Sequence, residues 1–78
     1  MKAKYVVVDY NGLELGVVFN KIFNHSDFDQ LGKILGAGMV IIGEDGDVIC
    51  YGNSITLGIV SRGVLDADAI KRSFKEDW

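Results

Sequence analysis

The Asn11-Gly12 pair, set between two apolar runs, constrains this chain more than any other feature. Residues 5–10 before it and 13–19 after it are rich in valine, tyrosine and phenylalanine, as strands are. Glycine adopts a positive φ freely and asparagine tolerates one, so the pair suits the centre of a type I′ turn. The sequence therefore predicts a β-hairpin. Alternate residues of its second strand share one face: Leu15, Val17 and Phe19.

A helix is expected after this hairpin. Ser26 is a suitable N-cap, and Asp29 follows three residues later as in a capping box. Apolar residues then recur at helical spacing, at Phe28, Leu31, Ile34 and Leu35. Gly36 and Gly38 are expected to end the helix, and Gly32 inside it suggests close packing against a neighbouring strand.

The second half of the chain predicts three more strands and a final helix. Residues 39–42 form a continuous apolar run, which favours a strand buried on both faces. Asp45-Gly46 marks a second hairpin turn, and strands are expected at 48–51 and 55–60. Asp66 is expected to cap the last helix. Its apolar stripe consists of Ala67, Ile70, Phe74 and Trp78.

The predicted fold is a single α+β domain over residues 1–78. Its element order is β-β-α-β-β-β-α, which suits an antiparallel sheet of four to five strands with two helices on one face. Helices on one face would leave the opposite face open. If that face is apolar, it forms a binding surface or a homodimer interface.

Charge and composition narrow the function. Eleven acidic and eight basic residues give a net charge of −3, and the basic residues are scattered, which argues against nucleic-acid binding. No apolar stretch approaches the ~20 residues of a membrane span, so no membrane association is expected. A single cysteine, Cys50, fits a reducing cytoplasm and argues against a multi-cysteine metal site.

Candidate chemical groups are few. His25 is the only histidine, and Cys50 lies in an apolar strand, where it is expected to be a small buried hydrophobe. His25 is expected to help order the start of the first helix. The acidic turn 44–47 lacks the ligand spacing of a calcium loop. We therefore expect no metal, no cofactor and no enzymatic activity; the alternative is a small enzyme that uses Cys50 or His25.

Contacts with other proteins are the remaining possibility. Aromatic residues and arginine are enriched among the residues that dominate binding at interfaces. On this basis the candidate protein-contact residues are Tyr10, Tyr51, Arg62 and Trp78. A homodimer through the sheet face or a sheet edge is the alternative use of such a surface.

Four stretches, 24–28, 36–40, 50–54 and 57–62, resemble small uncharacterised proteins encoded by bacteriophages and prophages. The resemblance covers most of the chain and implies no catalytic residue. It implies a class of proteins that bind and block a host protein. The sequence thus predicts a small non-enzymatic protein-binding module that acts in the host cytoplasm.

Overall fold

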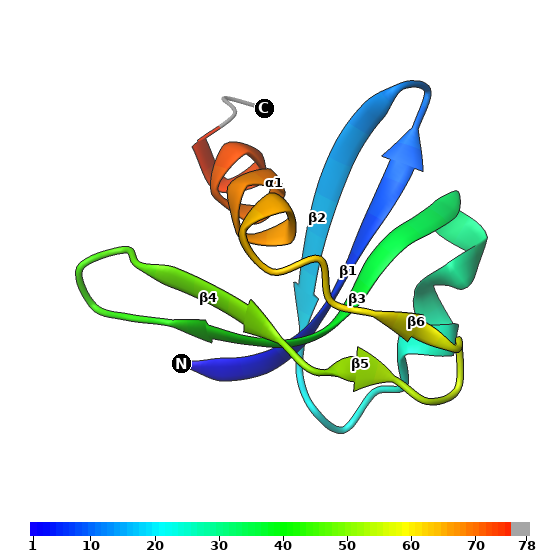
Figure 1. Cartoon of the computed structure of the whole chain (residues 1–78), viewed down its shortest axis with the longest axis horizontal. Helices are drawn as coiled ribbons and strands as arrows, with labels where there is room; N and C mark the ends of the chain where they lie inside the picture. The colour runs from blue at the N-terminus through cyan, green and yellow to red at the C-terminus, as the bar shows by residue number, and fades with distance from the viewer. Residues whose placement is uncertain (76–78) are drawn as a thin grey trace.

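The computed structural model describes residues 1–75 as a four-stranded antiparallel sheet, a short second hairpin, a 3-10 helix and an α-helix (Figure 1). The strands of the sheet stand in the order β2-β1-β3-β4. The elements are β1 (Lys2–Tyr10), β2 (Leu13–Phe19), the 3-10 helix η1 (His25–Leu31), β3 (Lys33–Ile42), β4 (Val48–Tyr51), β5 (Asn53–Ser54), β6 (Ile59–Val60) and α1 (Val64–Lys75). This arrangement confirms the predicted α+β class with an antiparallel sheet.

The first hairpin forms as predicted. Asn11 and Gly12 have φ angles of 53° and 85°, the left-handed values that a type I′ turn requires. Asp9 secures the turn, because its Oδ1 accepts a hydrogen bond from the Gly12 amide at 2.9 Å. The second strand, Leu13–Phe19, has the predicted bounds, whereas β1 begins at Lys2, three residues earlier than expected.

The predicted helix after this hairpin is wrong in extent and in kind. Residues 25–31 form a 3-10 helix, and β3 begins at Lys33, so Gly36 and Gly38 lie inside a strand. The start of the 3-10 helix is secured by Asp27, which accepts a hydrogen bond from the Asn24 amide at 2.9 Å, and not by Ser26 and Asp29 as predicted. Eight residue pairs join β3 to β1, and this long pairing outweighs the local helical spacing.

The two helical segments pack on opposite faces of the sheet, not on one face as predicted (Figure 1). Residues 5–8 in the middle of β1 are all fully buried. Tyr5 and Val7 pack in one cluster with Ala67 and Ile70 of α1. Val6 and Val8 point the other way and pack in a second cluster, which η1 and the β5–β6 hairpin cover. A strand that is apolar on both faces needs a cover on both.

Two glycines allow α1 to lie close to the sheet. Val7 pairs with Gly16 on β2 and with Gly36 on β3, so a residue without a side chain flanks it on each side. A Cβ at Gly16 would lie 2.8 Å from the Ile70 Cα, and one at Gly36 would overlap the Asp66 carboxylate. α1 therefore rests in a shallow trough over these two positions.

The strand predicted over residues 55–60 is also wrong. Residues 55–58 form a turn between the two-residue strands β5 and β6, and Ile55 is 89% exposed at its start. The predicted strand at 48–51 and the acidic turn before it are confirmed. The Gly43 amide donates a hydrogen bond to the Asp47 carbonyl at 2.9 Å and closes this turn. The final helix begins at Val64, two residues before the predicted cap.

Candidate functional site

His25 and Cys50 lie on opposite faces of the sheet. His25 is buried, its ring packs edge-on against Phe19 with centroids 5.5 Å apart, and its Nε2 lies 2.9 Å from the Gly38 carbonyl oxygen. Because a carbonyl only accepts, Nε2 carries the proton and donates. His25 thus ties the start of η1 to β3, in agreement with its predicted ordering role.

Cys50 lies on the α1 face, in the cluster of Tyr5, Val40 and Ile70. The prediction of a small buried hydrophobe is confirmed. Burial and, secondarily, the charge of Asp66 raise the pKa of the thiol to about 11. A thiolate at neutral pH is therefore disfavoured, and the sheet separates this thiol from His25.

A buried carboxylate, Asp66, organises the polar groups beneath α1. Its side chain is fully buried in the first turn of the helix. The Tyr5 hydroxyl lies 2.6 Å from the Asp66 Oδ2 and 2.6 Å from the Ser61 Oγ. A phenol has one proton and a carboxylate only accepts, so Tyr5 donates to Asp66. Burial and the bond to Asp66 raise the pKa of Tyr5 above its ordinary value.

Arg62 connects this cluster to β2. Its Nε donates to the Asp66 Oδ1 at 2.6 Å, its backbone amide donates to Oδ2 at 2.8 Å, and its Nη2 donates to the Glu14 Oε1 at 2.8 Å. Partial burial opposes the charge of Arg62, but the bonds to Glu14 and Asp66 outweigh it and raise its pKa. Asp66 therefore anchors the chain before α1 instead of capping the helix.

The buried polar cluster of Tyr5, Ser61, Arg62 and Asp66 is a tertiary clamp. It joins β1, the segment before α1 and α1 itself, and every buried side-chain polar atom of the described residues has a partner. Neither Tyr5 nor Asp66 reaches the surface, and only the half-buried Ser61 and Arg62 of this cluster are in contact with solvent. No group of His, Cys, Asp and Glu within residues 1–75 has the geometry to hold a metal ion.

The surface feature that stands out is an uncovered block of apolar side chains on β3 and β4. Met39 pairs with Tyr51, and Ile41 pairs with Ile49, so all four share one face. Ile49, Ile41 and Tyr51 are 57%, 38% and 37% exposed. These four residues, called the sheet patch below, lie on the same face as η1 but beyond the part of the sheet that it covers. The expectation that residues 39–42 are buried on both faces is thus wrong.

A hollow adjoins the sheet patch at Met39. Its volume is about 230 Å³, and its walls include Lys4, Asn24, Asn53 and Ile55. Ile55, the most exposed large apolar residue of the turn before β6, stands at its rim. The sheet patch, the hollow and Ile55 together form one surface with room for an inserted side chain.

The predicted contact residues do not form one site. Tyr51 lies on the sheet patch, and Arg62 is held in the buried cluster. Tyr10 is exposed at the far end of β1, about 20 Å from the patch along the strand at ~3.3 Å per residue. Trp78 lies outside the described residues. The alternation of Met39 with Ile41 and of Ile49 with Tyr51 was the sequence signal that could have found the patch.

Comparison with protein-family models, with curated proteins and with solved structures finds no match to this chain. Neither helical segment of residues 1–75 has the length and apolar character needed to cross a membrane.

Proposed function

We propose that this protein is a non-enzymatic binding module that uses the sheet patch to contact another protein. The observation that carries the proposal is the pairing of four large apolar residues on an uncovered face. Contiguous apolar surface of this kind is typical of interaction sites on small soluble proteins. The side chains that could act in catalysis also support a non-enzymatic role, because Cys50, His25, Tyr5 and Asp66 are all buried.

The charge beside the sheet patch indicates the chemistry of the partner. On β1, Lys2 pairs with Ile41 and Lys4 pairs with Met39, so both lysines lie on the same face next to the patch. Lys4 donates to the Phe23 carbonyl at 2.9 Å, while Lys2 is exposed. An amphipathic segment with an apolar stripe and acidic residues along one flank would satisfy both parts of this surface.

The resemblance of the sequence to small phage-encoded proteins supports a host protein as the owner of that segment. A module of this size can act by occupying a surface that the host protein needs for its own contacts. The outer edge of β4 borders the sheet patch and, among the described residues, pairs with no further strand. A bound segment can therefore extend over this edge.

The test first captures a stoichiometric partner from bacterial lysate and purifies it. The binding of this partner to Ile49→Glu is then compared with its binding to a matched variant, Val64→Glu. Both residues are exposed, and Val64 lies on α1, away from the patch. We expect Ile49→Glu to weaken binding at least about tenfold and Val64→Glu to leave it unchanged. Added salt should also weaken binding. Equal binding by both variants would reject the sheet patch as the contact.

A further inference from the structure

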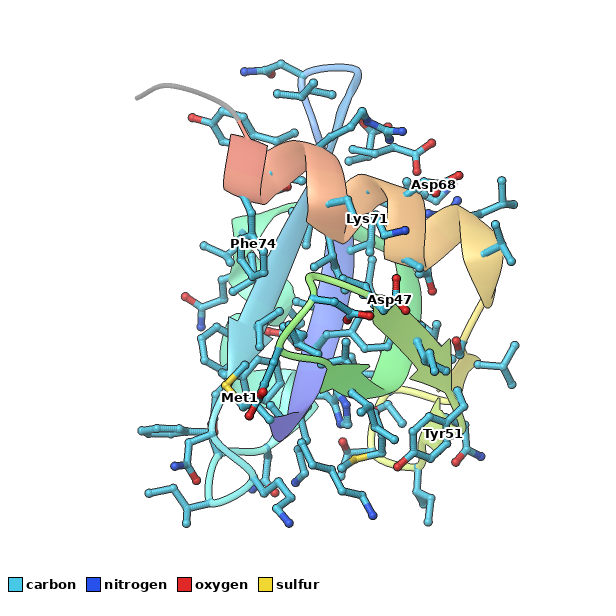
Figure 2. All side chains as sticks on the ribbon, turned by 90° about the vertical axis from the view of Figure 1, so that its left-hand side faces the viewer. Met1, Asp47, Tyr51, Asp68, Lys71 and Phe74 are labelled. Carbon is cyan, nitrogen blue, oxygen red and sulfur yellow. The ribbon has the colours of Figure 1, made fainter. Side chains whose placement is uncertain are left out.

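Two cavities lie between the C-terminal part of α1 and the sheet, one on each side of Phe74. Each has a volume of about 390 Å³, and Phe74, which is 58% exposed, lines both. Apolar residues of all four strands line them as well: Ala3, Val18, Ile42 and Val48. Figure 2 shows Phe74 at one end of α1, with Met1 below it and Asp47 toward the β3–β4 turn. We call Phe74 with its two cavities the Phe74 surface.

The two sides of the Phe74 surface carry opposite charge. Lys21 lines the cavity next to β2, and no acidic side chain of the described residues lines it. Asp45 and Asp47 line the cavity next to the β3–β4 turn, where Lys71 of α1 offsets one of the two charges. One exposed aromatic ring thus separates a basic hollow from an acidic one.

We infer that the Phe74 surface binds a second copy of this chain in a two-fold symmetric dimer. In such an interface each contact occurs twice, because residue i of one copy meets j of the other and j meets i. With the axis beside Phe74, the basic side of each copy faces the acidic side of the other. The exposed ring and the apolar lining are covered in the same step, so the surface is self-complementary in charge and in polarity.

The sheet patch lacks this property, which is why the two surfaces are assigned different partners. Lys2 and Lys4 border it on the β1 side, and β4 (Val48–Tyr51) on its other side carries no acidic residue, so two copies of the patch would gain no pairing of opposite charges. The sequence analysis offered a homodimer through the sheet face or edge as the alternative to a partner protein; the charges favour the Phe74 surface instead. The inference goes beyond the proposed function, and each can fail without the other.

Charge reversal tests the dimer most directly. Lys21 and Asp47 stand on opposite sides of the Phe74 surface, so Lys21→Asp alone or Asp47→Lys alone places like charges across the axis. Light scattering over a micromolar to millimolar series should show a dimer for the natural chain. Each single variant should dissociate at least about tenfold more readily. Mixing the two variants should restore the dimer, because in the mixed pair both contacts are again between opposite charges.

Phe74→Glu should give a monomer at every concentration, while Ile49→Glu should leave the dimer intact. Circular dichroism of each variant establishes that it folds, as expected for substitutions of exposed residues. A natural chain that stays monomeric throughout the series would overturn the inference. So would a dimer that Ile49→Glu dissolves and Phe74→Glu does not, or a mixture of the two charge variants that fails to associate.

Discussion

The two faces of the sheet are covered in different ways. On one face a single twelve-residue helix, α1, crosses from β4 to β2 and is held by the clamp around Asp66. On the other face the 3-10 helix η1 and the β5–β6 hairpin share the task, and they reach Val6, Val8 and Ala37 but not Ile41 or Ile49. One face is covered by a long helix and a half-buried ion pair, and the other is covered by short elements over part of its area.

This difference links stability to the clamp on the α1 face and partner binding to the sheet patch on the other face. A buried carboxylate with paired donors ties α1 to one position, because any shift would leave a charge unpaired. The short elements are held by the hydrogen bond of His25 to Gly38 and not by a buried carboxylate, and they leave a row of strand side chains exposed. Changes in the clamp or beneath α1 should therefore lower stability, whereas a change at Ile49 should alter binding and leave the fold intact.

The largest effect is expected from Asp66→Ala. Removing the carboxylate takes away the acceptor that the Tyr5 hydroxyl, the Arg62 guanidinium and the Arg62 backbone amide share. Hydrogen bonds to a charged group contribute about 1.5–3 kcal/mol each, so we expect a loss of at least about 3 kcal/mol. Urea unfolding followed by circular dichroism measures the loss. Asp68→Ala is the control, because Asp68 is an exposed residue of the same helix (Figure 2). If both variants had the same free energy of unfolding, the clamp would not hold α1.

A smaller effect is expected from Gly16→Ala, which tests the trough. The new Cβ would meet the Ile70 backbone at 2.8 Å, so α1 must shift, and overpacking of this kind costs about 1–3 kcal/mol. Gly43→Ala is the matched control. Its Cβ would come closer than 3.0 Å to one atom, the Oδ1 of the exposed Asp45 side chain, and moving that atom costs at most its surface hydrogen bond from the Asp47 amide. Equal thermal midpoints for both variants would contradict close packing of α1 on Gly16.

The smallest effect is a loss of stability in alkali that originates on the α1 face. Burial raises the pKa of Cys50 to about 11, whereas a thiol in an unfolded chain titrates near about 8.5. Between these values the folded state holds the proton that the unfolded state has lost, so the free energy of unfolding falls as pH rises. Below about pH 8.5 the contribution is fully present.

Cys50→Ala should flatten this fall between about pH 8.5 and 11, as measured by urea unfolding at a series of pH values. Tyr5, whose pKa burial also raises, still contributes above about pH 10 in both proteins. An unchanged pH slope in Cys50→Ala would show that the thiol has no part in the alkaline loss.

Part of the candidate site could be predicted from the sequence. Tyr51 was expected as a contact residue because aromatic residues anchor interfaces, and it lies on the sheet patch. Arg62 met the same criterion but is held between Glu14 and Asp66, 48 residues and four residues away in the chain. The spacing of four residues makes Asp66 a predictable partner of Arg62, whereas Glu14 lies far away in the sequence. The role of Arg62 therefore depended on how β2 lies against α1.

The sequence by itself determined the features whose causes are local. The Asn11-Gly12 turn follows from backbone preferences of two residues, and the strands at 13–19 and 48–51 follow from apolar runs bounded by turn residues. Only the tertiary structure decided the conformation of residues 32–38, where helical spacing competed with pairing to β1. It also decided that the two helical segments lie on opposite faces of the sheet. The physical reason is that pairing with a distant strand and burial under a distant helix contribute more than local propensity, and neither can be read from neighbouring residues.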